Sequence, residues 1–260
     1  MLIKNKIDIQ NMKIAGKITA DTLQMITKYI QPNISTNEIN NICHQYIIKK
    51  KAIPACLGYQ GFPKSICISK NEIVCHGIPN KNIFLKNGDI VNIDIAVIKN
   101  GYYSDASKMY FVGKISEKNK ILCKITQKSL YLALSHIKPG IFLKEIGAII
   151  QNYVEKKNFF IVKEYCGHGI GKNFHELPQV LHYKNFENNI ILQEGMTFTI
   201  EPMVNIGTSQ TKISKDGWTV KTLNNKCSAQ YEHTILVTKT GCEILTWQKN
   251  EKITSHLYNI

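Results

Sequence analysis

Arginine is absent from this chain of 260 residues, and all 33 basic side chains are lysines. Arginine is the side chain best suited to bidentate contacts with phosphates and bases. Its absence therefore weighs against specific recognition of nucleic acid, although the formal net charge is +14. Because asparagine and isoleucine are also abundant, the lysine excess is typical of codon bias in an AT-rich genome, and we expect no functional basic patch.

Long apolar runs are also missing, since no stretch reaches the roughly eighteen apolar residues that a membrane helix needs. The N-terminus, MLIKNKIDIQ, mixes lysine and aspartate with isoleucine and has no apolar core of a signal peptide. We therefore expect a soluble protein of the cytoplasm that has no membrane partner.

The eight cysteines contain no C-x-x-C pair, and they lie in segments that are otherwise apolar. In a chain of this size, that distribution favours packed, reduced thiols over a disulfide framework or a zinc ribbon. The sequence thus indicates a reducing compartment.

Periodic patterns predict helices followed by strands, twice over. Ser35 and Glu38 stand at capping-box spacing before a helical stretch, and Asn100-Gly101 is a strong hairpin signal. The predicted helices span about 8–30, 35–51, 116–137 and 142–157; the predicted strands lie in a hairpin over 88–113 and at 196–204, 229–238 and 242–246. We therefore predict an α+β fold with an antiparallel sheet formed from two similar halves, about 1–113 and 114–260, in one domain over 1–260.

The hairpin brings two aspartates together. If Asn100-Gly101 is a two-residue loop, Ala96 faces Asp105, and Asp94 lies two positions away on the same face. Two adjacent carboxylates among Ile, Val and Ala repel each other unless a cation or a shared proton compensates them. A solvated face would tolerate the pair, but the flanking residues VNIDIAVI are too apolar for one. We favour a metal site.

Three further ionisable residues occur in the second half, namely His168 in CGHGIG, Glu201 in TFTIEPM and Glu232 in SAQYEHTIL. Each alone could be a satisfied core residue. With the two aspartates they form an oxygen-rich set with one nitrogen, which suits two ions such as Mn, Co, Fe or Zn. The glycines beside His168 are expected where backbone approaches a ligand closely, and CGHGIGK lacks the Ser or Thr of a phosphate loop.

Over essentially its whole length the chain resembles the type I methionine aminopeptidase family. The matching stretches, in the family's order and spacing, are ACLGYQGFPKSICIS, NEIVCHGIPN, GDIVNIDIAV, GYYSDASKMYFVG, CGHGIGKNFHELPQV, GMTFTIEPM, DGWTVKT and SAQYEHTILVT. The resemblance implies the pita-bread fold, a pseudo-twofold α+β domain. It also implies a metal-dependent hydrolase that removes the initiator methionine from nascent proteins when the second residue is small.

The resemblance also implies roles for individual residues. Two divalent metal ions would be held by Asp94, Asp105, His168, Glu201 and Glu232, with Asp105 and Glu232 bridging them. Three residues would be catalytic: His76 would contact the substrate near its scissile amide, His175 would hold the carbonyl oxygen, and Glu201 would transfer a proton. The methionine pocket would be formed by Cys56, Tyr59, Phe62, Cys67, Phe174 and Trp218, although plain core roles remain open for Phe62 and Cys67.

The chain departs from the family pattern at three positions. Leu177 and Lys184 stand where acidic residues are usual, and Phe62 stands where tyrosine is common. None of the three is a predicted metal ligand. The absence of an N-terminal extension and of a long insertion between His175 and Glu201 resembles the short bacterial or organellar form.

Three alternatives are weighed against this interpretation. A proline-specific aminopeptidase of the same fold normally carries a further N-terminal domain, for which the chain has no room. An inactive relative acting as a binding module would have lost metal ligands. An RNA-binding or ribosome-binding protein would show clusters of arginine and aromatic residues. For an enzyme acting on the N-termini of nascent polypeptides, transient contact with the ribosome remains a hypothesis, and we expect a monomer.

Overall fold

A computed structural model describes residues 3–186, 189–249 and 251. Within these residues the helices are α1 (Lys6–Ile26), η1 (Thr27–Tyr29), α2 (Thr36–Lys49), η2 (Tyr59–Gly61), α3 (Glu117–His136) and α4 (Leu143–Glu155), where η denotes a short 3-10 helix. The strands of the first half are β1 (Ile53–Pro54), β2 (Cys67–Lys70), β3 (Ile73–Cys75), β4 (Ile90–Lys99) and β5 (Tyr102–Phe111). Those of the second half are β6 (Phe160–Ile161), β7 (Gly167–Gly169), β8 (Glu176–Val180), β9 (Thr197–Ile200), β10 (Met203–Asn205), β11 (Thr211–Ile213), β12 (Val220–Thr222), β13 (Ser228–Gln230), β14 (His233–Val237) and β15 (Cys242–Ile244).

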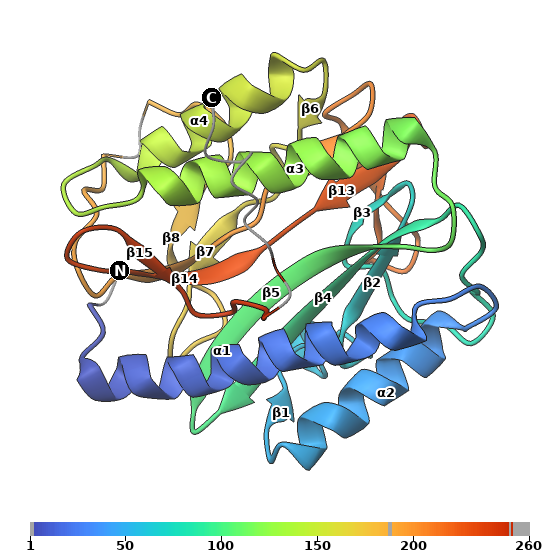
Figure 1. Ribbon diagram of the computed structural model, residues 1–260, viewed down its shortest axis with the longest axis horizontal. Coiled ribbons are helices and arrows are strands. Elements are labelled where there is room, and N and C mark those ends of the chain that lie inside the picture. The colour runs from blue at the N-terminus through green and yellow to red at the C-terminus, as the bar shows by residue number, and fades with distance from the viewer. Residues whose placement is uncertain (1–2, 187–188, 250, 252–260) are drawn as a thin grey trace.

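Two pairs of helices flank the strands. Figure 1 shows α1 and α2 along one half of the molecule and α3 and α4 along the other, with the strands between them. Each half has its own core of aliphatic side chains: α1 and α2 pack on β4 and β5, while α3 and α4 pack on β9, β10 and β14. The predicted order of helices followed by strands in each half is thus confirmed.

Strand pairing is antiparallel throughout the described part of the chain. A sheet with the order β1-β4-β2 carries β5 on β4, and a second sheet has the order β15-β14-β9-β7-β8. Two three-stranded sheets have the orders β13-β10-β6 and β11-β12-β3. Backbone hydrogen bonds exchanged between Ser107 on β5 and Glu232, at 3.1 and 3.4 Å, join the two halves. The predicted α+β class with antiparallel sheets is confirmed.

The hairpin register agrees with the sequence-based expectation. Ala96 pairs with Asp105, and Asp94 pairs with Ser107, two positions along the same face. Asn100 and Gly101 both have positive φ, of 53° and 78°, as a type I′ turn requires. The turn therefore fixes which side chains of β4 and β5 point to the same face.

Two stretches that were each predicted as one strand are each divided into two strands. The stretch 196–204 is divided into β9 and β10 around Glu201 and Pro202, and 229–238 is divided into β13 and β14 around Glu232. Proline has no N–H for a sheet ladder, and each break moves the chain into a different sheet. Both glutamates therefore lie at crossings between sheets, where their side chains leave the regular alternation.

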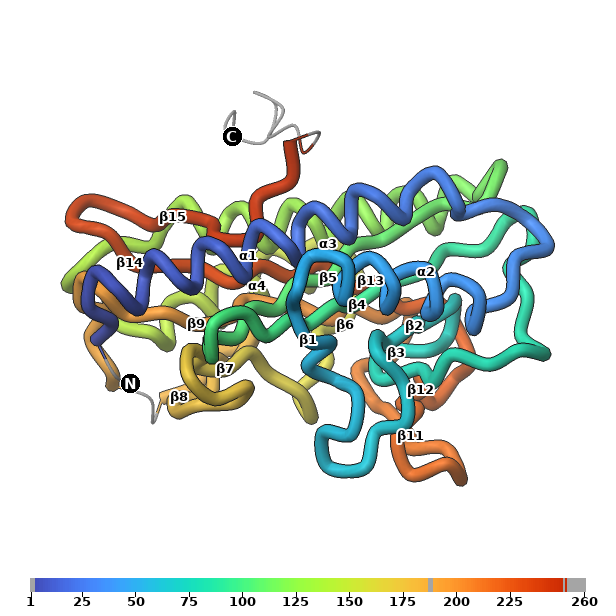
Figure 2. Tube along the Cα trace, turned by 90° about the horizontal axis from the view of Figure 1, so that it is seen from below, coloured from blue at the N-terminus to red at the C-terminus, as the bar shows by residue number. Residues whose placement is uncertain are grey.

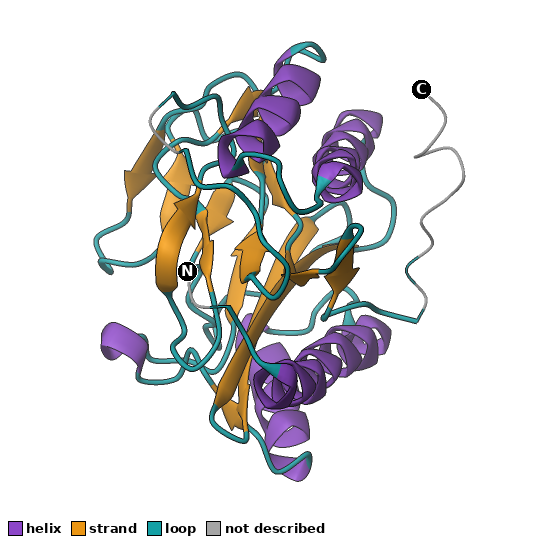
Figure 3. Cartoon of the chain, turned by 90° about the vertical axis from the view of Figure 1, so that its left-hand side faces the viewer, coloured by secondary structure: helices purple, strands orange, loops and turns teal. Residues whose placement is uncertain are grey.

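In Figure 2 the helices α1, α2 and α3 run along one side of the strands, whereas the β7–β8 turn, the segment between β1 and β2, and the β11–β12 hairpin lie on the opposite side. Figure 3 shows long helices above and below the strands. Among the described residues, no helix is long and apolar enough to cross a membrane.

Candidate metal centre and substrate pocket

Four acidic side chains and one histidine converge where the two halves meet. Asp94 comes from β4, Asp105 from β5, His168 from β7, Glu201 from the β9–β10 junction and Glu232 from the β13–β14 junction. All five line one pocket of about 380 Å³. Ligand atoms of Asp105, His168 and Glu232 lie within 4.8 Å of one another. The structure thus brings together the whole predicted ligand set.

The imidazole of His168 is oriented toward the carboxylates. Its Nδ1 lies 3.0 Å from the carbonyl oxygen of Gly169, to which it can donate. Nε2 then carries the lone pair, and it lies 3.9 Å from Asp105 Oδ2 and 3.8 Å from Glu201 Oε1. Burial lowers the pKa of His168 to about 3. The ring is therefore neutral at pH 7, which is the state in which histidine binds a metal ion.

The carboxyl groups are held where ionisation is costly. Burial raises the pKa of Asp94 to about 6 and that of Glu201 to about 8. Burial and mutual repulsion raise the pKa values of Asp105 and Glu232 well above their ordinary range. Four carboxyl groups that cannot all ionise together form a site in which cations would be strongly favoured.

Unpartnered oxygen atoms provide an independent test of whether metal ions fit. Asp94 Oδ1, Asp105 Oδ1 and Glu232 Oε1 are buried and have no hydrogen-bond partner. Buried polar atoms are nearly always paired, so each such atom needs a partner. Oxygen-rich sets with one imidazole suit divalent ions of intermediate hardness. The residues present therefore fit a metal centre.

Glu201 is additionally fixed by neighbours that do not belong to the ligand set. Thr199 Oγ1 donates to Glu201 Oε1 at 2.7 Å and accepts from the backbone N–H of His168 at 3.0 Å. The backbone N–H of Glu201 donates to His182 Nε2 at 3.1 Å, and Gln230 Nε2 lies 3.3 Å from Glu201 Oε2. Thr199 thus ties two of the predicted ligands together.

The glycines beside His168 lie against neighbouring strands. A Cβ atom on Gly167 would lie 2.4 Å from the carbonyl oxygen of Thr199, and one on Gly169 would lie 2.5 Å from that of Leu177. The expected approach to a ligand stays a prediction. These glycines allow β7 to fit between β8 and β9, which places His168.

Two further histidines lie at the mouth of the carboxylate cluster. His76 follows β3 with a positive φ of 54°, a conformation that costs a residue with a Cβ about 1–2 kcal/mol. Burial, reinforced by His175, lowers the pKa of His76 to about 4. The Nδ1 atom of His175 lies 2.8 Å from the hydroxyl oxygen of Tyr59, and its ring lies 4.1 Å from that of His168. Burial also lowers the pKa of His175, so both rings are neutral near pH 7.

The predicted substrate residues form the apolar side of the same pocket. Phe62 packs edge-on against Trp218 with ring centres 5.2 Å apart, and Phe174 packs edge-on against Tyr59 at 4.9 Å. Cys56 and Cys67 complete this wall. All thirteen residues predicted as ligands, catalytic groups or pocket residues therefore line one pocket. Phe62 and Cys67 also belong to a buried apolar cluster, so their part in binding substrate stays a prediction.

Five lining residues were not predicted, namely Gln60, Glu164, Tyr165, Cys166 and Met203. Each lies within a few residues of a predicted site residue, in GYQGF, EYCGHG or EPM. Closeness to these motifs could therefore have indicated that they line the pocket. Of the three positions that depart from the family pattern, Leu177 and Lys184 do not line the pocket, whereas Phe62 does. The side chain of Leu177 is 77% exposed.

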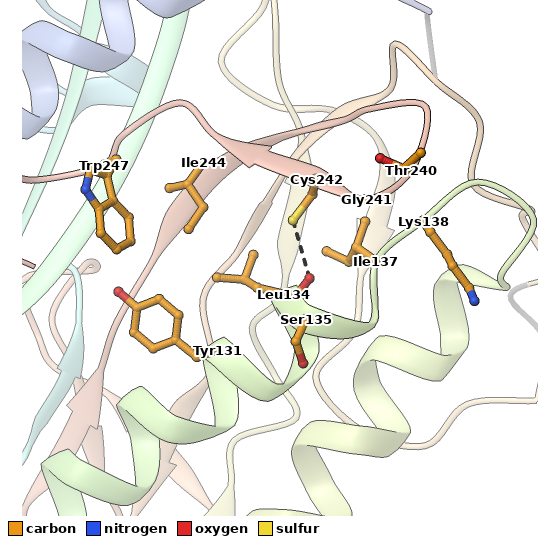
Figure 4. Close-up of a pocket in the computed structure, with 10 residues that line it drawn as sticks. All are labelled: Tyr131, Leu134, Ser135, Ile137, Lys138, Thr240, Gly241, Cys242, Ile244 and Trp247. Atoms are coloured by element: carbon orange, nitrogen blue, oxygen red, sulfur yellow. Dashed lines mark hydrogen bonds between the residues drawn. The ribbon is translucent and has the colours of Figure 1, made fainter. Parts of the chain in front are cut away.

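A separate hollow of about 500 Å³ lies between the end of α3 and the β14–β15 turn. Figure 4 shows Tyr131 and Trp247 at one end of it and the Cys242 thiol directed at the carbonyl oxygen of Leu134, at 3.3 Å. It shares no lining residue with the carboxylate pocket and contains no cluster of acidic residues. We assign it no function.

Comparison with known families decides the class of protein. The model of metallopeptidase family M24 matches residues 10–239. The chain belongs to metallopeptidase family M24. Within this family, a methionine aminopeptidase of Buchnera aphidicola subsp. Schizaphis graminum is 63% identical over 99% of this chain and 98% of its own length. The methionine aminopeptidase of Escherichia coli strain K12 is 58% identical over 96% of both chains.

Solved structures show the same fold. The crystal structure of methionine aminopeptidase from Rickettsia prowazekii has a TM-score of 0.93, with 49% identity over 95% of this chain and all of that chain. Prolidase from Pyrococcus furiosus has a TM-score of 0.76 with 23% identity, and this chain covers 66% of it. The second likeness shows the fold alone. The predicted pita-bread fold is thereby confirmed.

Proposed function

We propose that this M24 enzyme hydrolyses the peptide bond after an N-terminal methionine, with nascent proteins whose second residue is small as its substrates. The supporting observation is the placement of a carboxylate and imidazole cluster beside a sulfur-rich and aromatic pocket within one cavity. Thiol, aromatic and thioether groups are polarizable and pack well together, so this wall suits a methionine side chain. Relatives more than 50% identical along nearly the full chain carry the name methionine aminopeptidase.

The metal centre would be held by Asp94, Asp105, His168, Glu201 and Glu232. We propose that these residues hold two divalent ions, of Mn, Co, Fe or Zn. Ions bound there would supply Lewis-acid activation of water and of the substrate carbonyl. Asp94 Oδ1, Asp105 Oδ1 and Glu232 Oε1 are buried without a hydrogen-bond partner, which supports metal binding by these carboxylates.

Glu201 would move the proton. Its carboxyl group is buried and held by Thr199 at 2.7 Å, and burial raises its pKa to about 8. A carboxyl group with a raised pKa can accept a proton from attacking water and return it to the leaving amine. The Thr199 hydroxyl would keep one carboxylate oxygen fixed while the other is used.

The two histidines would act on the peptide rather than on the ions. A neutral His175 whose Nδ1 accepts a hydrogen bond from the Tyr59 hydroxyl would present an N–H at Nε2 to the carbonyl oxygen as it becomes negative. His76, across the pocket and in edge-on contact with Tyr165, would contact the scissile amide. A neutral imidazole can fill both roles, and the lowered pKa values of His76 and His175 keep both rings neutral near pH 7.

The decisive test is hydrolysis of Met-Ala-Ser, Met-Leu-Ser and Ala-Pro peptides by purified protein, after chelation and again with each divalent metal restored. We expect methionine release from Met-Ala-Ser only, and only with metal present. Cleavage of Ala-Pro would favour the proline-specific alternative, and no cleavage with any metal would favour an inactive binding module.

We further propose one catalytic domain over residues 1–260 that acts as a monomer in the cytoplasm. Eight free cysteines support a reducing compartment. Transient contact with the ribosome would bring the enzyme to nascent chains, and the lysine excess could assist it. Neutralising surface lysines and finding ribosome cosedimentation unchanged would count against this contact.

A further inference from the structure

A buried ion pair links the beginning of the chain to the segment that carries His175. Lys4 is only 7% exposed although lysine is usually solvated. Its Nζ donates to Glu176 Oε2 at 2.8 Å, and the two side chains are 5% and 10% exposed. The pair joins positions that are 172 residues apart.

Glu176 transmits this contact to the loop that precedes it. Its second carboxylate oxygen, Oε1, accepts from the backbone N–H of Asn173 at 3.2 Å. The N–H of Gly171 in turn donates to the carbonyl oxygen of Asn173 at 3.2 Å, and the carbonyl oxygen of Gly171 accepts from Tyr103 at 2.8 Å. This loop, residues 171–176, contains Phe174 and His175. Hence one carboxylate supports the backbone of two predicted pocket residues.

The lysine side chain fits tightly at this place. A Cβ atom on Gly171 would lie 2.3 Å from Lys4 Nζ and 2.9 Å from Glu176 Oε1, so a side chain at this position would displace the ammonium from where it lies. The N–H of Lys4 donates to the carbonyl oxygen of Gly195 at 2.9 Å. Directly afterwards, Asn5 caps α1. Figure 2 shows the start of α1 and strand β8 at the same end of the molecule.

We propose that Lys4 is a positioning residue for His175, acting through Glu176 and the loop 171–176; this inference rests on the proposed aminopeptidase function. The Lys4 ammonium pairs with Glu176 out of water, and Glu176 in turn holds the Asn173 amide. Removing one partner of a buried ion pair is strongly destabilising, so without Lys4 we expect the Glu176 side chain to leave its place and the loop to move with it. Misplacement of a catalytic group by about 1 Å can slow a reaction by about 10²-fold.

The test compares Lys4→Met, which keeps an unbranched side chain and removes the ammonium, with Lys13→Met, which removes a lysine from an ion pair that is 40% and 44% exposed. We expect Lys4→Met to lower kcat by about tenfold with KM within about twofold, because the lost interaction acts on the transition state. Lys13→Met should match the unaltered protein.

The same substitution is then made together with His175→Ala. If Lys4 acts through His175, Lys4→Met should change kcat by less than about twofold once the imidazole is gone, because residues that act as a unit are not additive. An equal loss of kcat in both backgrounds would overturn the proposal, since it would show a general structural effect.

Amide hydrogen exchange of the metal-free protein gives a readout that does not depend on activity. We expect the peptide covering residues 171–176 to exchange faster in Lys4→Met and to remain unchanged in Lys13→Met; unaltered exchange in Lys4→Met would overturn the proposal. If the unaltered enzyme cleaves no methionyl peptide, the proposed function fails, whereas exchange still decides whether Lys4 holds the loop. Should Lys4→Met not fold, Glu176→Gln keeps the side-chain volume, and it is expected to lower kcat only while His175 is present.

Discussion

Individual side chains in the pocket divide into groups that hold charge and groups that fill space. Glu201 belongs to the first kind, because it is buried, bound by Thr199 and Gln230, and has a raised pKa. Trp218 belongs to the second, because its ring contacts Phe62 and His76 while its backbone is held by Asp216 Oδ1 at 3.0 Å. Substituting a residue of the first kind should lower kcat, whereas substituting one of the second kind should lower kcat/KM.

Replacing Glu201 by glutamine should lower kcat for a Met-Ala-Ser peptide by about 10²–10⁴-fold, because an amide cannot accept and return a proton. Steady-state kinetics with saturating metal would measure it. Glu243→Gln changes a glutamate that is 44% exposed in a surface ion pair and should leave kcat unchanged. Near-normal kcat in Glu201→Gln would exclude the proton-transfer role.

Replacing Trp218 by alanine should reduce kcat/KM for methionyl peptides by about tenfold, because one wall of the side-chain pocket is lost. The matched control is Trp247→Ala, since Trp247 lies in the separate hollow of Figure 4. Equal losses in the two variants would show that the Trp218 effect is one of stability rather than of binding.

At the scale of secondary-structure elements, the β4–β5 hairpin decides the distance between Asp94 and Asp105. Its two-residue turn sets the register, and a shift of one residue would move every side chain to the opposite face. The turn depends on positive φ at both Asn100 and Gly101. The backbone conformation of these two turn residues therefore affects which side chains of β4 and β5 face the candidate metal centre.

Gly101→Ala should lower the free energy of unfolding by about 1–2 kcal/mol, because a Cβ is disfavoured at a φ of 78°. Apart from the two chain neighbours of Gly101, none of the described residues places a heavy atom within 4 Å of the added Cβ, so backbone strain is the expected cost. Urea unfolding would measure it. Gly241→Ala, at a glycine with no positive φ and its nearest neighbour at 3.8 Å, should change stability by less than about 0.5 kcal/mol.

At the scale of the whole molecule, the carboxylate cluster costs stability unless cations compensate it. In the metal-free protein, burial raises the pKa of Glu201 from 4.5 to about 8. The folded state thus retains a proton that the unfolded state releases, and stability must fall as pH rises through this interval. His76 and His168, whose pKa values are lowered from 6.5 to about 4 and about 3, act in the opposite direction, but only below pH 6.5.

Chelated protein should therefore lose stability between pH 6.5 and pH 8, the range above the ordinary histidine pKa and up to that of Glu201. The loss from Glu201 alone would be at most about 1.4 kcal/mol per pH unit. Divalent metal should raise the melting temperature, and more so at the higher pH, since it binds the ionised carboxylates. Thermal unfolding with and without chelator would measure both effects. Equal gains from metal at pH 6.5 and pH 8, or an unchanged slope in chelated Glu201→Gln, would contradict this account.

The sequence by itself determined the local elements and the identity of the candidate site. The Asn100-Gly101 turn, the alternation around Asp94 and Asp105, and the capping box at Ser35 act over a few residues, and the structure agrees with each. The motifs around His168, Glu201 and Glu232 indicated the remaining members of the cluster. Local patterns suffice wherever the deciding interaction is between residues close in the chain.

Only the tertiary structure decided how distant segments meet. The breaks at Glu201 and Glu232 arise because the chain passes from one sheet to another, the glycines beside His168 serve neighbouring strands, and Lys4 finds Glu176 across the molecule. Strand pairing between halves and a buried ion pair depend on burial and on neighbours that are far away in the sequence. The polar sequence around Lys4 therefore did not indicate that its side chain is buried against the loop that carries His175.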